Sequence, residues 1–224
     1  MTGFGFALIA VPLLSLFIPE LRNITPIIVI YSFLTNIIIF YKTKQYIDFK
    51  KILPLIIFGI IATPLGTYIL LYINVNTLKV IVGTIIVITA LAMLKNYKIK
   101  INKQNISYGV VGLLSGFLNG STGLSGPPVV LFLTNQNTDK DVFRANLTLY
   151  GIATNVFAII LFISEGIINT SVLNFTALYL PALIIGTFLG INASSKINEA
   201  LFKTLTIYLI SFLGLYTVIS TILK

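Results

Sequence analysis

The sequence contains no cysteine and no histidine, and only 9% of its 224 residues are charged. Without cysteine there is no disulfide, thiolate metal site or cysteine nucleophile. Without histidine the commonest general base and metal ligand are missing. No buried carboxylate pair or Ser–Lys arrangement replaces them, so we expect no enzyme activity, no metal site and no cofactor.

Acidic residues are also scarce, and all six lie in loops or at the ends of expected helices. A carboxylate relay within the membrane, the usual means of proton coupling, is therefore not evident. We expect coupling to depend on the substrate's own charge or protonation state. The six residues are Glu20, Asp48, Asp139, Asp141, Glu165 and Glu199.

Hydrophobic residues make up 57% of the chain, and they gather in long uncharged runs. A membrane-spanning helix needs about 20 apolar residues. The runs are residues 1–19, 23–41, 52–78, 80–94, 104–138, 145–164, 166–195 and 204–223. They predict an all-α, polytopic, multi-pass protein of a prokaryotic cytoplasmic membrane. No cleavable signal peptide is expected, because Met1 is not followed by a basic segment.

The net charge of +9 would suggest nucleic-acid binding in a soluble protein. Here the lysines cluster in short loops, at residues 41–51 and 95–105. This pattern is the positive-inside bias of membrane proteins, so we expect a lipid bilayer and no nucleic acid as partner.

About six full spans are expected, at residues 24–41, 52–72, 77–94, 142–163, 173–193 and 200–223. The chain divides into a first membrane repeat (1–94), a lysine-rich cytoplasmic loop (95–105) and a second membrane repeat (106–224). YSFLTN at residues 31–36 is answered by YGIATN at 150–155, and LGT at 65–67 by IGT at 185–187. Such internal repeats are typical of secondary transporters, with the binding site at the repeat interface.

Residues 115–128 read SGFLNGSTGLSGPP, and TGFG at residues 2–5 is a shorter copy. The glycines and two adjacent prolines predict an interrupted helix, since glycine costs about 1 kcal/mol and proline about 3 kcal/mol in a helix interior. Irregular backbone at membrane depth persists only inside protein or beside a water-filled cavity. The stretch is therefore the candidate substrate site.

Two topologies are open for residues 107–136. One broken helix crossing the membrane would leave nine basic residues inside and six outside. A re-entrant hairpin, with arms of about 10–12 residues, would give twelve inside and three outside. The positive-inside rule favours the hairpin. The two halves then become inverted repeats whose tips approach the midplane from opposite faces. The first repeat is expected to lack its first arm, either because the chain begins in mid-hairpin or because the start codon was placed late.

The expected tip offers uncharged donors, which suit a small oxyanion held tightly enough to select and loosely enough to release. The tip residues are Asn119, Gly120, Ser121, Thr122, Gly123, Ser125, Gly126 and Pro127. Pro127 begins the second arm and directs the positive end of its helix dipole to the tip. The alternative is that small residues only permit close helix packing. We favour a site because the glycines cluster with prolines instead of following a GxxxG spacing.

The paired Tyr31 and Asn36, and Tyr150 and Asn155, are expected to present polar groups to a shared centre, or else to form interhelical hydrogen bonds. Arg144 is a candidate gate or anion-attracting residue. The alternative for Arg144 is that it extends to the interface or pairs locally.

The chain resembles the TauE/SafE family of sulfite exporters and related anion permeases. The resemblance covers almost the whole chain and rests on TGFGFALIAVPLL, GLLSGFLNGSTGLSGPPVVLFL and FRANL. It implies transport of sulfite, sulfonates or other small organic anions. The motif positions are Gly3, Gly5, Asn119, Gly120, Thr122, Gly123, Gly126, Pro127 and Arg144. Ser125 stands where glycine is more usual.

The predicted function is that of a permease working by alternating access on a small anion. An anion-selective channel and an inactive or accessory membrane subunit remain alternatives. Homodimerisation is left open.

Overall fold

The computed structural model describes residues 21–94, 104–134, 136 and 139–194, with single positions near each terminus at 7, 10, 11, 14, 208, 211, 212, 215, 216, 218, 219 and 221. The described residues contain helices and no strand, which confirms the all-α prediction. The helices are α2 (Leu21–Thr43), η1 (Lys44–Tyr46), α3 (Phe49–Tyr72), α4 (Val75–Leu94), α5 (Gln104–Thr122), α6 (Gly126–Thr134), α7 (Lys140–Ser164) and α8 (Thr170–Ser194).

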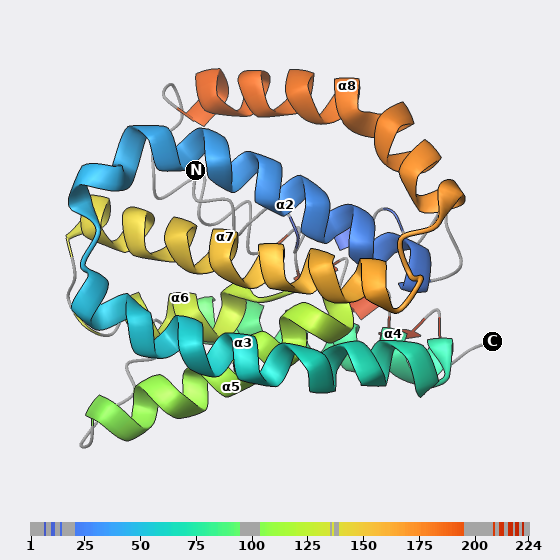
Figure 1. Ribbon diagram of the computed structural model, residues 1–224, viewed down its shortest axis with the longest axis horizontal. Coiled ribbons are helices and arrows are strands. Elements are labelled where there is room, and N and C mark those ends of the chain that lie inside the picture. The colour runs from blue at the N-terminus through green and yellow to red at the C-terminus, as the bar shows by residue number, and fades with distance from the viewer. Residues whose placement is uncertain are drawn as a thin grey trace.

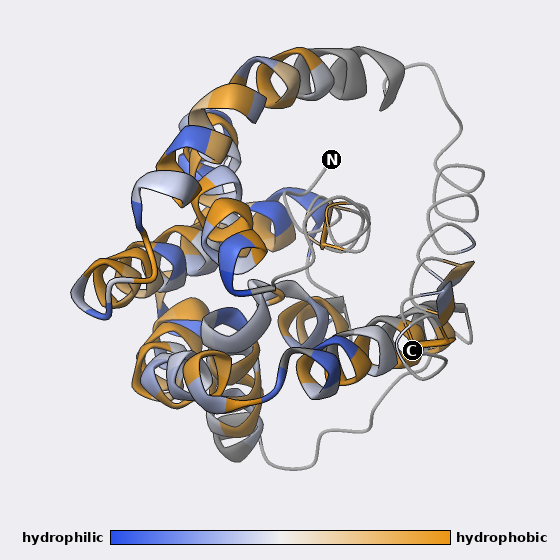
Figure 2. Ribbon diagram, turned by 90° about the vertical axis from the view of Figure 1, so that its right-hand side faces the viewer, coloured by the Kyte–Doolittle hydropathy of each residue, from blue (hydrophilic) through white to orange (hydrophobic). Residues whose placement is uncertain are grey.

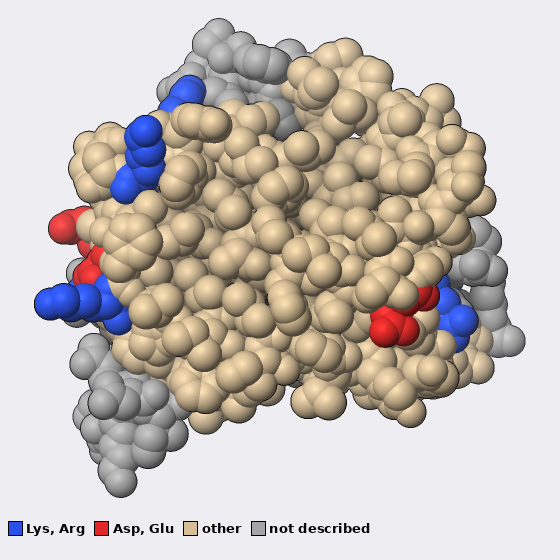
Figure 3. Space-filling model, in the orientation of Figure 1, with Lys and Arg blue, Asp and Glu red and all other residues tan. Residues whose placement is uncertain are grey.

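Three of the described helical segments are long and apolar enough to cross a membrane: Arg22–Tyr46, Phe49–Tyr72 and Lys140–Ser164. α4 and α8 lie where the spans at residues 77–94 and 173–193 are expected. Most of the expected span 200–223 is outside the described residues. Apolar residues cover much of every described helix (Figure 2), and Figure 3 shows a wide uncharged band between charged side chains at two ends. The protein is therefore a membrane protein.

The helices form a bundle with two distinct ends (Figure 1). The lysine end consists of residues 42–51 and 139–144, and the far end contains Arg22, Leu71 and Glu165. Arg22 ties α2 to the last turn of α3 by donating from Nε to the Leu70 carbonyl O at 3.2 Å and from Nη2 to that of Leu71. α2 therefore runs from the far end to the lysine end, while α7 begins at the lysine end and runs the opposite way.

α5 and α6 form a helical hairpin, called here the α5–α6 hairpin. The helix ends at Thr122, Gly123 adopts a φ of 72°, and helix resumes at Gly126. The Tyr108 hydroxyl donates to Gln136 Oε1 at 3.0 Å, and the rings of Tyr108 and Phe132 lie 4.7 Å apart. α6 therefore folds back along α5, and residues 107–136 are not one continuous helix.

Glycine explains how α5 lies so close to α3. A Cβ on Gly116 would overlap the backbone of Gly59, and a Cβ on Gly120 would overlap the Thr63 carbonyl O. The spacing of Gly112, Gly116 and Gly120 is that of the GxxxG pattern, which lets helix backbones approach closely. Our statement that the glycines do not follow this spacing was wrong, and Gly120 serves packing between α5 and α3.

The arms of the α5–α6 hairpin are unequal, with 19 residues in α5 and 9 in α6, whereas two arms of about 10–12 residues were predicted. Close packing on α3 supports the longer arm despite its glycines. Gly120 contacts Thr63 and Thr67, so the tip lies beyond the middle of α3. The tip of the first repeat, with Gly3 and Gly5, lies outside the described residues.

The buried apolar residues form two clusters. The first joins α2, α3, α7 and α8 toward the far end and includes Ile24, Ile28, Leu70 and Phe162. The second lies between the α5–α6 hairpin, α3 and α7 and includes Leu55, Val129, Leu147 and Tyr150. The hairpin tip lies between the two clusters, since Leu124 belongs to the first and Val129 to the second.

Candidate functional site

The tip of the α5–α6 hairpin is held by three hydrogen bonds. Gly123 N–H donates to the Asn119 carbonyl O at 3.0 Å, and Leu124 N–H donates to Thr122 Oγ1 at 3.3 Å. Ser115 Oγ, two turns before the end of α5, donates to the Ser125 carbonyl O. These bonds fix residues 119–126 as a compact turn between the two arms.

Asn119 is the unusual residue of this turn. Its side chain is fully buried, and neither Nδ2 nor Oδ1 has a hydrogen-bond partner. A buried polar group without a partner costs about 1–3 kcal/mol, so such groups call for an explanation, such as an absent ligand or water. Asn119 is thus a buried amide near the end of α5 whose side chain has no hydrogen-bond partner.

The other tip residues offer fewer donors than predicted. The hydroxyls of Ser121 and Thr122 donate to the carbonyls of Phe117 and Leu118, each at 2.8 Å, within α5. Pro127 and its neighbour Pro128 have no N–H group. The backbone N–H groups that precede the first helical hydrogen bond of α6 are therefore those of Ser125 and Gly126. Gly123 contributes its positive φ rather than a binding group.

Tyr150 faces the α5–α6 hairpin from α7. It is almost fully buried, its hydroxyl included. That hydroxyl lies beside Ser115, and a Cβ built on Gly59 would be 2.7 Å from it. The hydroxyl therefore lies where α3 and α5 cross. Asn155 is buried further along α7.

The corresponding residues of α2 contact α8 and α7. The Tyr31 hydroxyl donates to the Thr176 carbonyl O of α8 at 2.6 Å. The Asn36 amide lies against Gly151 of α7, where a Cβ would overlap it. The two sets of polar residues therefore serve different helix contacts. Arg144 is half-buried at the lysine end, six residues before Tyr150 and about 9 Å from it along the helix axis.

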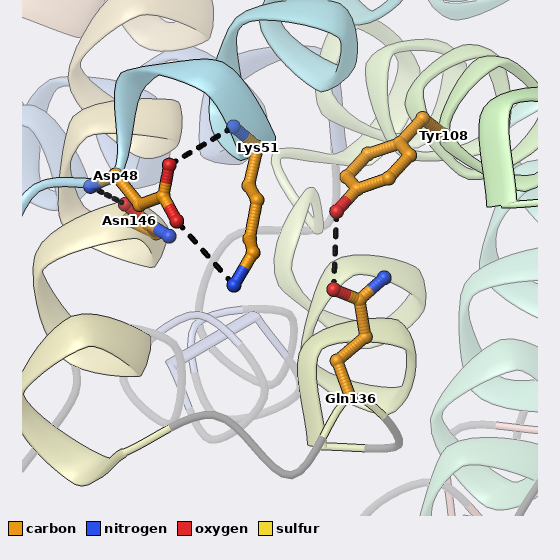
Figure 4. A network of polar contacts seen from close by, with 5 residues as sticks. All are labelled: Asp48, Lys51, Tyr108, Gln136 and Asn146. Carbon is orange, nitrogen blue, oxygen red and sulfur yellow. Dashed lines mark hydrogen bonds and ion pairs between the residues drawn. The ribbon is translucent and has the colours of Figure 1, made fainter.

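The sequence prediction missed a polar cluster at the base of the hairpin (Figure 4). Asn146 is fully buried, and its Oδ1 accepts from Asp48 N–H at 2.9 Å. Asp48 caps α3 by accepting from Lys51 N–H at 3.3 Å, and its Oδ2 lies 3.3 Å from Lys51 Nζ. Asn146 Nδ2 and Gln136 Nε2 are buried without a partner. Asn146 lies one helical turn before Tyr150, and this spacing in the sequence could have identified Asn146 as a candidate.

This cluster borders a depression of about 630 Å³ at the lysine end. Its lining includes Asp48, Lys50, Lys51, Gln136 and Asp139. Positive and negative side chains are balanced there, so the depression is polar without a strong net charge. Within the described ranges, no group of three metal-ligating side chains is present.

The sequence is similar to known proteins. Residues 1–217 match the family described as "Sulfite exporter TauE/SafE". The chain is 23% identical over 195 residues to the "Probable sulfite/organosulfonate exporter TauE" of Cupriavidus necator, covering 85% of this chain and 76% of that protein. No solved structure matches the chain. The match over residues 1–217 covers nearly the whole length, and the chain therefore belongs to the sulfite exporter TauE/SafE family.

Proposed function

We propose that the protein is a secondary transporter that moves a small oxyanion, such as sulfite or an organosulfonate, across the cell membrane. The substrate binds at the tip of the α5–α6 hairpin. Membership of an exporter family supports the anion class, and the relative from Cupriavidus necator carries a name with the same substrates. The absence of a formal charge among residues 115–128 fits a site that must also release its substrate.

The observation that carries the proposal is the buried amide of Asn119 without partners. An oxyanion would accept from its Nδ2 and from the N–H groups of Ser125 and Gly126, and the N-terminal end of α6 adds a favourable dipole. Hydrogen bonds to a charged group contribute about 1.5–3 kcal/mol each. The proposed site therefore selects by geometry while keeping binding reversible.

We propose further that the α5–α6 hairpin is re-entrant, with both ends in the cytoplasm. Tyr108 and Gln136, near its two ends, are hydrogen-bonded to each other, and Gln136 borders the same depression as Lys50 and Lys51. The basic residues of this end, including Lys42, Lys44, Lys140 and Arg144, then satisfy the positive-inside rule.

Alternating access is the proposed mechanism, with one inverted repeat rocking against the other. The opposite directions of α2 and α7 support it, as do their exchanged contacts. Tyr31 of the first repeat reaches α8, and Tyr150 of the second reaches α3 at Gly59. A two-fold relation between the repeats would place each of these helices against the following helix of the other repeat.

The test is flux through purified protein in proteoliposomes, measured with labelled sulfite against sulfate and acetate as competitors. We expect saturable sulfite transport, and a reduction of about tenfold or more in Asn119→Asp, because a carboxylate repels the anion that the amide would bind. Asn169→Asp is the matched control, since Asn169 Oδ1 accepts from Val172 N–H at 3.0 Å and the substitution keeps this acceptor.

Flux that does not saturate, together with single-channel conductance, would show a channel. Absence of flux would favour an accessory role. Equal sulfite transport by folded Asn119→Asp and wild-type protein would contradict the tip site.

A further inference from the structure

Most of the buried polar groups without a partner near the hairpin are donors. They include the amide nitrogens of Asn119, Gln136 and Asn146, and Asn119 Oδ1 is the acceptor among them. The assignment for Asn146 is fixed, because its Oδ1 accepts from a backbone N–H. Waters or oxyanion oxygens would satisfy the amide nitrogens.

These donors follow one another from the tip to the lysine end. Asn146 and Tyr150 are one turn apart on the same face of α7, about 6 Å along its axis. The Tyr150 hydroxyl lies beside Ser115 of α5. Asn119 follows Ser115 by one turn on the same face of α5. We call Asn146, Tyr150 and Asn119 the donor row.

The donor row leads to the polar depression at the lysine end. Asn146 is bonded to Asp48, which borders the depression together with Lys51 and Gln136 (Figure 4). Gln136 Oε1 accepts from Tyr108, which leaves its Nε2 as the free donor at this border. Buried donors are thus spaced about one helical turn apart between the depression and the tip.

We propose that the donor row is the path by which the oxyanion passes between the hairpin tip and the lysine end, with Gln136 and Asn146 forming a second oxyanion site at its mouth. This inference rests on the proposed function and identifies residues beyond the tip. Neighbouring donors on one helix are about 6 Å apart along its axis. The anion therefore passes from one set of uncharged donors to the next and keeps hydrogen bonds throughout.

The depression also contains the carboxylates of Asp48 and Asp139. Asp48 is neutralised by Lys51 at 3.3 Å and is occupied as the N-cap of α3. Asp139 is exposed at the start of α7. The second site therefore depends on the buried amides of Gln136 and Asn146, and the exposed charges contribute little to it.

Two substitutions test the donor row with little change in packing. Tyr150→Phe removes only the hydroxyl that lies beside Ser115. Asn146→Asp keeps the oxygen that accepts from Asp48 N–H and replaces the free donor by a negatively charged oxygen. The matched controls are Tyr68→Phe, at an exposed position of α3, and Asn169→Asp, at the far end.

In proteoliposomes loaded with labelled sulfite, we expect transport by Tyr150→Phe and Asn146→Asp to fall by about tenfold or more, the effect of losing a hydrogen bond to a charged group. The thermal midpoints of both variants are measured alongside, so that lost transport is not confused with lost folding. Both controls should transport as wild type does.

Wild-type transport in the two donor-row variants would overturn the path while leaving the proposed function intact. A wild-type protein that moves no sulfite would overturn the proposed function itself. If Asn146→Asp unfolds, Gln136→Glu makes the same exchange while keeping the acceptor for Tyr108, and wild-type flux in that variant would also count against the second site.

Discussion

The two ends of the bundle are built differently. In the far half, buried apolar side chains such as Ile24, Ile28 and Phe162 pack together between α2 and the end of α7. The half toward the lysine end has buried amides without partners and a polar depression. The hairpin tip lies between these halves, with Gly123 against Ile28.

We infer that the apolar half contributes mainly to stability and the polar half mainly to function. The apolar half gains close packing, while each unpartnered donor in the polar half costs about 1–3 kcal/mol. Such buried groups are expected where a ligand or a water molecule forms the missing hydrogen bonds. Thr25 is an exception on the apolar side, since its buried hydroxyl also lacks a partner and its carbonyl O lies near Gly123.

The largest effect on stability should come from the apolar half. Phe162→Ala removes a fully buried ring from the far cluster, and we expect a loss of about 3–5 kcal/mol, because the cavity forfeits both the ring's contacts and those of its neighbours. Unfolding in detergent measures this loss. A change below about 1 kcal/mol would remove the contrast between the two halves.

A smaller loss is expected where α3 and α5 touch. Gly116→Ala would force a Cβ into the Gly59 carbonyl and cost about 1–3 kcal/mol through overpacking. Gly186→Ala is the matched control, because its Cβ would meet nothing within 4 Å in the middle of α8. The control should be neutral or more stable by about 1 kcal/mol, the helix preference for alanine. Equal effects at the two glycines would contradict the close α3–α5 contact.

The paired tyrosines Tyr31 and Tyr150 also differ in the contacts of their hydroxyls. Tyr31→Phe removes a hydroxyl bonded to Thr176 and should cost about 1 kcal/mol. Tyr150→Phe removes a hydroxyl beside Ser115 and should cost no more than Tyr31→Phe. Thermal unfolding of the two variants side by side gives the sign. Greater destabilisation by Tyr150→Phe would mean that its hydroxyl has a structural partner.

The smallest effect is expected at the charged rim. Lys51→Met breaks the ion pair with Asp48, in which both side chains are well exposed. Exposed pairs contribute about 0.2–1 kcal/mol and are screened by salt. The loss should shrink further in 1 M salt. A large loss that salt does not change would show that this pair is more buried than its geometry indicates.

The sequence was sufficient for the helical class and the location of the break, because glycine and proline act locally at residues 123–128. It did not reveal that Ser121 and Thr122 donate within their own helix, which is the usual alternative for hydroxyls in apolar surroundings. Asn146 was missed because its bond to Asp48 spans 98 residues. The packing of Gly120 was missed because it depends on α3, which is distant in sequence.

The most direct test is equilibrium binding of sulfite to purified Asn119→Leu protein. Leucine has a similar size and removes an amide that has no partner. We therefore predict a variant at least as stable as the wild type that no longer binds sulfite. Wild-type affinity in a folded Asn119→Leu protein would contradict the claim that buried, uncharged donors at the hairpin tip hold the anion.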